Sequence, residues 1–213
     1  MERIFQSHAN NCATGSDINE HLALISELAG ECTSALEIST QGSSSLYALA
    51  AGIGKKEGGH LYYINSARIE QGEFCQNCAI AGIHLTFFNE SSINFEVKKI
   101  GSIDLLFIDS IHSYFHILKE LRVLAPITRK YIVMHDTTID AHLSELKRMG
   151  MNVKEYCDKY GCKRWEAERG VEGAITLFLQ ENSDWMIKTK RENNNGLTVL
   201  CKRESTLYES ILD

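Results

Sequence analysis

The chain alternates short apolar segments with amphipathic ones, and this alternation constrains its fold more than any other feature. We expect five strands, at residues 34–39, 60–65, 85–88, 103–108 and 131–134. Helical patterns lie around and between them, at residues 17–30, 46–53, 69–82, 113–124, 138–149 and 172–181. Strands that alternate with helices form a parallel sheet covered by helices on both faces. The strand at 103–108 is apolar at nearly every position, which is typical of such a buried strand.

The C-terminal part of the chain predicts a different kind of strand pairing. Residues 185–189 and 197–201 have strand character and flank an Asn-Asn-Asn-Gly sequence at 193–196, which is typical of a hairpin turn. We therefore predict a doubly wound, Rossmann-like α/β fold with about seven strands, mostly parallel and closed by an antiparallel hairpin. The 213 residues suit one domain, with a helical lead-in at 1–33 and an insertion at 152–173 near the acceptor site.

Composition excludes several classes of function. Hydrophobic residues make up 44% and charged residues 23% of the chain, as in a globular protein, and the formal net charge of -6 argues against a nucleic-acid partner. No apolar run approaches the ~20 residues that span a membrane. The N-terminus lacks the apolar core of a secretory signal. We therefore expect a cytoplasmic protein, and the sequence leaves room for a homo-oligomer.

Seven cysteines are scattered along the chain, two of them in the C-x-x-C sequence Cys75–Cys78 and two more as the close pair Cys157 and Cys162. Four thiolates are enough for a structural zinc ion. However, the spacing of the second pair does not match a zinc knuckle, and few turn residues surround either pair. We interpret the cysteines as reduced thiols.

Ligands of doubly wound sheets bind beyond the carboxyl ends of the strands, so the residues that follow each strand are candidate binding residues. The first strand carries Glu37 and is followed by small residues, which let a ligand approach the backbone. This segment lacks the G-x-G-x-x-G spacing of nicotinamide and flavin sites, and the acidic Glu37 favours a methyltransferase. Beyond the second strand, Asn65 can hydrogen-bond ribose hydroxyls. Beyond the third, Glu90 can contact adenine.

From these strand ends we predict a binding site for S-adenosylmethionine. The alternative is that they are ordinary turns and capped loops without a ligand. The residues that we expect to bind the cofactor share this position at strand ends; they are Glu37, Ser39, Thr40, Gln41, Gly42, Ser44, Asn65, Ser66, Glu90, Ser91, Ser92 and Asp109.

The fourth and fifth strand ends carry the strongest chemical signal. Asp109 follows the strand at 103–108 directly, with His112 three residues further on, and the fifth strand ends in His135 and Asp136. Adjacent strands lie ~4.8 Å apart, so Asp109 and Asp136 can converge on one divalent cation. His135 is a candidate third ligand or a residue of the pocket wall. His112 is the candidate catalytic base because imidazole titrates near neutral pH. The alternative is that Asp136 only caps the next helix.

At this point the chain resembles a known group of enzymes. The sequence Phe-Ile-Asp-x-x-His-Ser-Tyr at 107–114 and Met-His-Asp-Thr at 134–137 is similar to class I methyltransferases of the cephalosporin-hydroxylase-like and macrolide or rhamnosyl sugar O-methyltransferase group. The segments at 16–22, 36–38 and 193–200 extend the similarity over nearly the whole chain. The two central motifs are specific in combination and weak singly.

The resemblance implies O-methylation of a sugar hydroxyl, assisted by Mg²⁺ or Mn²⁺. It implies metal ligands at Asp109 and at the pair His135 and Asp136, with His112 as general base. The family has an acid at the position of His135, and an imidazole ligand shifts the preference from magnesium toward manganese. The family also has a glycine at the position of Ser39.

We therefore expect an O-methyltransferase that acts on a small-molecule or glycan acceptor, with His112 and Asp109 as catalytic residues. Residues expected to contact the acceptor are His112, Ser113, Tyr114, Arg164 and Trp165. One alternative is methylation of a phenolic acceptor. Another is a cofactor-binding module without catalysis in a glycan-building protein, and a nicotinamide oxidoreductase is more distant.

Overall fold

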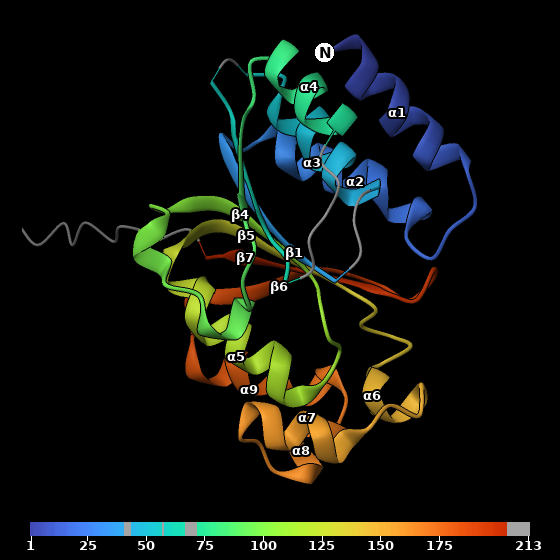
Figure 1. Ribbon diagram of the computed structural model, residues 1–213, viewed down its shortest axis with the longest axis vertical. Coiled ribbons are helices and arrows are strands. Elements are labelled where there is room, and N and C mark those ends of the chain that lie inside the picture. Colours follow the sequence, from blue (N-terminus) through green and yellow to red (C-terminus); the bar gives the residue numbers. More distant parts are fainter. Residues whose placement is uncertain (41–43, 57, 67–71, 204–213) are drawn as a thin grey trace, which may run out of the picture.

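The computed structural model describes residues 1–40, 44–56, 58–66 and 72–203, and it contains the predicted central sheet (Figure 1). The first five strands are β1 (Ser34–Ser39), β2 (His60–Ile64), β3 (His84–Phe88), β4 (Ile103–Asp109) and β5 (Thr128–His135). The C-terminal hairpin is formed by β6 (Trp185–Arg191) and β7 (Leu197–Lys202). The strand order is β3-β2-β1-β4-β5-β7-β6, parallel from β3 to β5 and antiparallel where β7 joins β5. The predicted Rossmann-like fold is confirmed.

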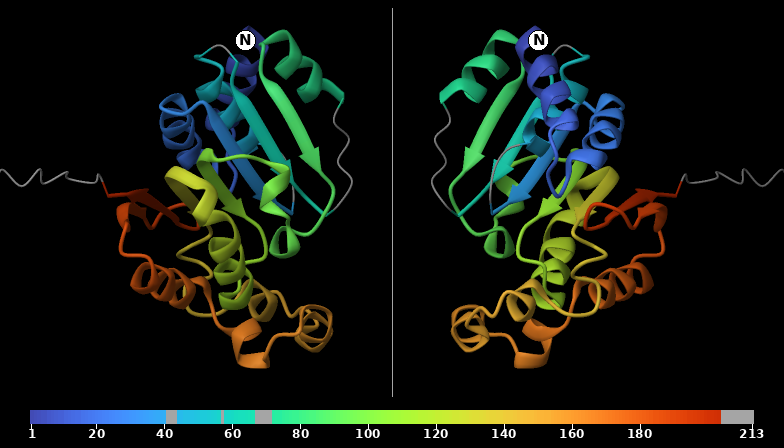
Figure 2. Two further views of the ribbon diagram at one scale, coloured as in Figure 1. Left: turned by 90° about the vertical axis from the view of Figure 1, so that its left-hand side faces the viewer. Right: turned by 90° about the vertical axis from the view of Figure 1, so that its right-hand side faces the viewer.

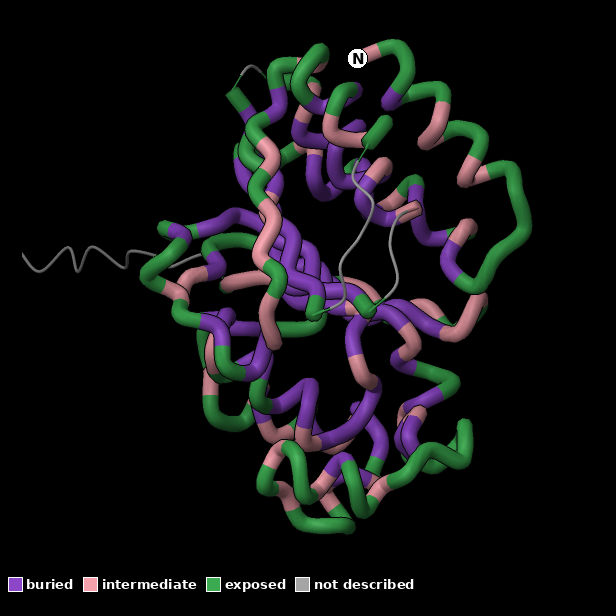
Figure 3. Tube along the Cα trace, viewed as in Figure 1, coloured by how far each residue is buried: buried purple, intermediate pink, exposed green. Residues whose placement is uncertain are grey.

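The sequence of the strands explains why helices cover both faces of the sheet. Alternate residues of one strand point to opposite faces. In β4, Leu105 and Phe107 belong to one apolar cluster, whereas Leu106 and Ile108 belong to the other. Figure 3 shows the central strands as continuously buried. The sheet is therefore the middle layer of three.

The helices divide between these two faces (Figures 1 and 2). One face is covered by α1 (Glu2–Ala13), α2 (Leu22–Gly30), α3 (Ser44–Ile53) and α4 (Gly72–Ile80). The other is covered by α5 (Tyr114–Leu124) and α9 (Val171–Glu181). Short 3-10 turns lie at Asn19–His21, Ser92–Asn94, Val97–Lys99 and Ala125–Ile127. No helix of the described residues is long and apolar enough to cross a membrane.

The segment after β5 differs from its prediction. A helix over 138–149 is wrong: turns follow β5, and only the short helix α6 (Glu145–Arg148) forms. The backbone N–H groups of Thr138 and Ile139 donate to the carbonyl oxygen of Asn195, at 2.9 and 3.0 Å. Leu143 forms a bridge with Arg169. Hydrogen bonds to distant parts of the chain thus replace the local bonds of a helix.

The segment 152–173 folds into α7 (Val153–Tyr160), α8 (Arg164–Glu168) and the first turn of α9. Asn152 caps α7 by accepting from the N–H of Glu155, and Gly161 ends it in the left-handed conformation, with φ 68°. The two short helices pack beside α5 below the sheet (Figure 1). This places the segment next to the loops that follow β4 and β5.

Candidate active site

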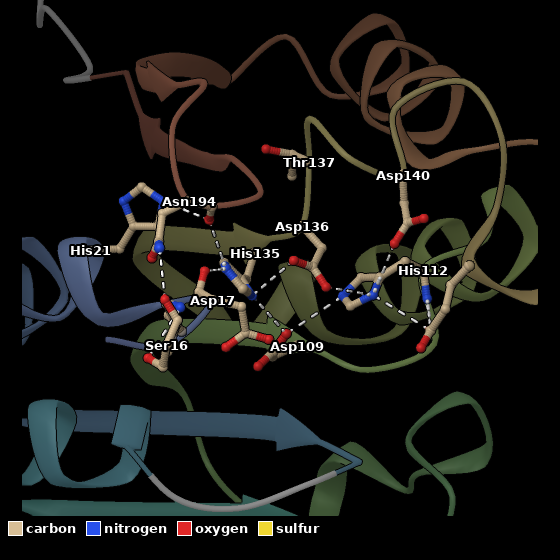
Figure 4. Close-up of polar contacts among 12 residues, drawn as sticks. Ser16, Asp17, His21, Asp109, His112, His135, Asp136, Thr137, Asp140 and Asn194 are labelled. Carbon is tan, nitrogen blue, oxygen red and sulfur yellow. Dashed lines mark hydrogen bonds and ion pairs between the residues drawn. The ribbon is translucent and has the colours of Figure 1, made fainter. Parts of the chain in front are cut away.

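The carboxyl ends of β4 and β5 bring together the residues with the strongest chemical signal (Figure 4). Ile108 pairs with Met134 in the sheet, so Asp109 and His135 leave adjacent strands side by side. Asp136 adopts a left-handed backbone conformation, with φ 56°. This conformation is uncommon outside glycine and concentrates at functional sites. It turns the chain sharply as the strand ends and holds the carboxylate of Asp136 at the edge of the sheet.

His112 lies at the centre of a group of carboxylates. Its Nε2 is 3.5 Å from Asp109 Oδ1, and its Nδ1 is 3.3 Å from Asp136 Oδ2. Two further acids face Nδ1, Asp140 at 3.6 Å and Glu145 at 3.5 Å. Burial lowers the pKa of His112, but Asp109 and Glu145 raise it by more, to about 10. His112 is therefore held as an imidazolium while the neighbouring carboxylates carry their full charge.

His135 is fixed at both ring nitrogens. Its Nδ1 lies 3.1 Å from Asp109 Oδ1 and 3.3 Å from Asp136 Oδ1. Its Nε2 lies 3.0 Å from the carbonyl oxygen of Asp17 and 3.3 Å from that of Asn194. Because carbonyl oxygens only accept, Nε2 carries a hydrogen. In the neutral ring, the lone pair of Nδ1 then faces the two carboxylates.

The donor set fits a divalent cation. One ligand atom each from Asp109, His112 and Asp136 lies within 4.8 Å of the others. Both ring nitrogens of His112 and Oδ1 of Asp136 are buried without a hydrogen-bond partner among the described residues. Buried polar atoms normally have partners, so unsatisfied ones mark a place for a ligand. Carboxylates with imidazole suit Mn²⁺ or a similar ion.

A cavity of about 210 Å³ opens onto this group. Its wall is formed by residues from four parts of the chain, all of them polar or charged except Ile18: Ser16, Asp17, Ile18, Thr40, Ser44, Ser45, Asp109, His112, Asp136 and Glu145. The N-terminal lead-in therefore contributes to the candidate site. Of the predicted cofactor residues, Thr40, Ser44 and Asp109 line this cavity.

A second, small cavity lies beside the first and shares Thr40 with it. Its wall contains most of the other residues predicted from strand ends, namely Ser39, Asn65, Ser66, Glu90, Ser91 and Ser92. Several of them have partners within the protein: Asn65 donates to the Tyr63 hydroxyl at 2.9 Å, Ser92 donates to Glu120 at 2.5 Å, and Glu90 accepts from Lys99 at 2.7 Å. Gln41 and Gly42 lie outside the described residues.

The residues predicted to contact the acceptor are less well grouped. His112 lines the polar cavity, but Ser113 is fully buried and caps α5 by accepting from the N–H of His116. Tyr114 is buried against Trp165, with ring centroids 5.5 Å apart. Arg164 lines a separate cavity of about 530 Å³ between α6 and α7 and pairs with Glu168 at 2.8 Å. Trp165 is half exposed.

Sequence reasoning missed four residues of the site. Asp140 and Glu145 face His112, and Asp140 is fully buried in a two-point ion pair with Arg148, at 2.7 and 2.9 Å. Asp17 and Asn194 hold His135 through backbone carbonyls. Asp17 and Asn194 lie in segments singled out for other reasons, the similarity at 16–22 and the turn at 193–196. The others join the site through contacts between distant segments.

Glu37, predicted at the cofactor site, is fully buried behind the polar cavity. One carboxylate oxygen accepts from Ser45 Oγ at 2.8 Å, and the other has no hydrogen-bond partner among the described residues. Burial, helped by the charge of Asp109, raises the pKa of Glu37 from 4.5 to about 8. Glu37 is therefore protonated near neutral pH when no ligand is bound.

This raised pKa predicts a specific dependence of stability on pH. Between pH 4.5 and about 8, the folded protein holds a proton on Glu37 that the unfolded chain releases. The contribution of Glu37 to the free energy of unfolding is therefore complete below pH 4.5 and is lost as pH rises through about 8. Urea unfolding across this range should show the wild type losing stability relative to Glu37→Gln as pH rises. The exposed control Glu27→Gln should differ from the wild type by the same free energy of unfolding at every pH. The same constant difference for Glu37→Gln would contradict the assignment to Glu37.

The fold and the candidate site together define a class of protein: a Rossmann-like α/β fold with a polar cavity at the carboxyl ends of β1, β4 and β5. A family model described as Rhamnosyl O-methyltransferase/CmcI matches residues 84–203. The chain belongs to this family and is an S-adenosylmethionine-dependent O-methyltransferase. Catalysis is thus favoured over a non-catalytic module.

Solved structures show the same fold at low sequence identity. A protein from Corynebacterium glutamicum matches with a TM-score of 0.62 at 13% identity, covering 95% of this chain and 90% of that one. An O-methyltransferase from Bacillus cereus, solved in complex with SAH, matches with a TM-score of 0.54 at 15% identity, covering 95% and 90%. The O-methyltransferase TomG from Streptomyces achromogenes, in complex with SAM, matches with a TM-score of 0.54 at 16% identity, covering 94% and 88%. A search of curated proteins found no match.

Proposed function

We propose that this enzyme transfers the methyl group of S-adenosylmethionine to a sugar hydroxyl, assisted by a divalent cation. The observation that carries the proposal is the convergence of Asp109, His112 and Asp136 within 4.8 Å at the mouth of a polar cavity. Asp109 and Asp136 would hold the cation, with His135 Nδ1 as a further ligand. The cation would polarise the acceptor hydroxyl and lower its pKa.

His112 is the proposed general base. Three carboxylates face Nδ1, those of Asp136, Asp140 and Glu145, whereas Nε2 faces Asp109. Nδ1 therefore keeps its hydrogen, and Nε2 is the nitrogen that exchanges a proton with the acceptor. His112 loses its proton more readily when the charges of Asp109 and Asp136 are compensated. The neutral ring then accepts the hydroxyl proton as the oxygen attacks the sulfonium methyl group.

S-Adenosylmethionine is proposed to lie across the two cavities, from Glu37 and Thr40 toward Asn65 and Glu90. Both cavities share Thr40, so they are adjacent at the ends of β1, β2 and β3. The unpartnered oxygen of Glu37 suits the positively charged methionine portion. Asn65 offers both a donor and an acceptor for ribose hydroxyls.

The wall of the catalytic cavity favours a sugar over a phenolic acceptor. Ile18 is the one apolar residue among the ten that line it. A catechol ring needs apolar walls, whereas a polyhydroxylated ring needs hydrogen-bond partners such as Ser16, Asp17 and Glu145. The segment 152–173, with Trp165 half exposed, remains the proposed further contact for the acceptor.

An assay with labelled S-adenosylmethionine and Mn²⁺ tests the proposal. We expect transfer of the label to deoxyhexose glycosides and little transfer to catechols. A chelator should abolish the activity, and Mn²⁺ should restore it at least as well as Mg²⁺ because imidazole is a better ligand for manganese. Methylation of catechols alone would contradict the acceptor class. Activity that is indifferent to the chelator would contradict the role of the cation.

A further inference from the structure

The thiols of Cys157 and Cys162 lie close together, in the last turn of α7 and in the turn that follows it. The thiol of Cys162 donates to the sulfur of Cys157 at 3.5 Å across the turn that joins α7 to α8. A disulfide needs the sulfurs about 2.05 Å apart, so they must approach by roughly 1.5 Å. Both residues are half-buried, and Cys157 lines the cavity of about 530 Å³, so a small oxidant can reach it.

Tyr160, between these cysteines, belongs to the wall of the proposed cofactor cavity. It lines the same space as Asn65 and Glu90, together with His116. That space is only about 30 Å³ in this arrangement, whereas sites for ligands of this size are on the order of 300 Å³ or more. The side chain of Tyr160, or another part of this wall, must therefore move before an adenosine group can enter.

Both helices are held on α5 by aromatic residues. The helix α8 is anchored to α5 by Trp165 against Tyr114, with ring centroids 5.5 Å apart, and by the fully buried Ala167. The helix α7 is held by the Tyr156 hydroxyl, 2.8 Å from His116 Nδ1, and one turn later it reaches the cavity through the ring of Tyr160, 5.7 Å from that of His116. A covalent bond from Cys157 to Cys162 would tie the end of α7 to the anchored α8.

We propose that Cys157 and Cys162 form a reversible disulfide that holds Tyr160 across the cofactor cavity and weakens cofactor binding. With a hydroperoxide as oxidant, the Cys157 sulfur takes up one peroxide oxygen as a sulfenic acid while the rest leaves as water or alcohol. The Cys162 sulfur then displaces that oxygen as water. Both thiol hydrogens end in these products, the two sulfurs are oxidised, and the peroxide is reduced. Cys157 lines the cavity of about 530 Å³, whereas burial raises the pKa of the Cys162 thiol, so Cys157 is the sulfur that reacts first.

The first test is whether the bond forms and restrains the segment. The full chain is treated with an equimolar hydroperoxide, and its peptides are analysed by mass spectrometry. We expect a peptide bridged between Cys157 and Cys162, with two hydrogens lost, and slower hydrogen exchange over residues 153–168. Cys201→Ser should behave as wild type, whereas Cys157→Ser and Cys162→Ser should show neither effect. Absence of the bridge, or a bridge with unchanged exchange, would overturn the proposal.

The second test measures the affinity of the oxidised and reduced protein for S-adenosylhomocysteine. We expect about 10-fold weaker binding after oxidation, within the usual range for coupled sites. Tyr160→Ala should remove the difference while the bridge still forms. Equal affinities in the wild type would overturn the proposal. This inference rests on the proposed cofactor site only through Tyr160. If neither form binds S-adenosylhomocysteine, the cofactor site itself is wrong, and hydrogen exchange still decides whether the bond restrains the segment.

Discussion

Replacing His112 by glutamine is expected to lower the rate of methyl transfer by about 10²–10⁴-fold, the usual contribution of a general base. Glutamine keeps a similar size and can still hydrogen-bond Asp140 and Glu145, but it cannot accept a proton. His142→Gln is the matched control, because the side chain of His142 is 84% exposed in the same region of the chain. The measurement is single-turnover transfer to the best acceptor at saturating Mn²⁺.

The same variant separates the two roles open to His112, which lies within reach of a cation as well as of the acceptor. If His112 is the base, His112→Gln should bind Mn²⁺ with nearly the affinity of the wild type while catalysis is lost. Loss of Mn²⁺ binding together with activity would make His112 a ligand instead. Full activity in a folded His112→Gln protein would remove it from the mechanism altogether.

Replacing Asp109 by asparagine is expected to remove both cation binding and activity. Loss of a group outside the ligand shell commonly costs about 10–100-fold in metal affinity, so loss of a direct carboxylate ligand should cost more than about 100-fold. The change also removes the charge that faces His112 and His135, at 3.5 and 3.1 Å. Titration of Mn²⁺ by electron paramagnetic resonance, which detects the free ion, measures the affinity directly.

The same strand offers a control for Asp109→Asn. Asp104 is also a buried carboxylate of β4, but it lies at the opposite end and pairs with Arg129 at 2.9 Å and with Thr33. Asp104→Asn should lower stability and leave the affinity for Mn²⁺ unchanged. Unaltered Mn²⁺ binding in Asp109→Asn would place the cation elsewhere.

The central sheet could be predicted because its strands are buried on both faces. Burial of that kind demands apolar side chains at successive positions, as at 103–108, and this pattern is visible without any tertiary information. The C-terminal hairpin could also be predicted, since its turn needs residues that adopt the left-handed backbone conformation. Asn194, Asn195 and Gly196 adopt φ values of 49°, 67° and 96°. Asparagine and glycine are the residues that tolerate this conformation best.

The segment after β5 could not be predicted from local pattern. Apolar residues at Ile139, Leu143 and Leu146 have helical spacing, yet Ile139 donates its N–H to Asn195 in the hairpin turn. Contacts between segments that are far apart in sequence decided the structure there. The same contacts bring Asp140 and Glu145 to His112. Because these contacts could not be predicted from the sequence, neither the backbone path nor these two residues of the candidate site could be predicted.

The candidate catalytic residues at the strand ends could be predicted because the carboxyl ends of adjacent parallel strands meet at one edge of the sheet. Asp109, His112 and Asp136 were recognised from their positions after two strands, and the structure brings them together. The acceptor contacts were harder to predict. Ser113 follows His112 in the chain but points into the protein to cap α5, because a helix begins at Tyr114.

The most direct measurement of the proposed mechanism is the anomalous scattering of manganese in crystals grown with Mn²⁺ and S-adenosylhomocysteine. We expect one peak between Asp109 and Asp136, about 2.2 Å from a carboxylate oxygen of each, with the cofactor product extending toward Asn65. A bound cofactor product without manganese at this site, or manganese bound only elsewhere, would contradict cation-assisted methyl transfer at the ends of β4 and β5.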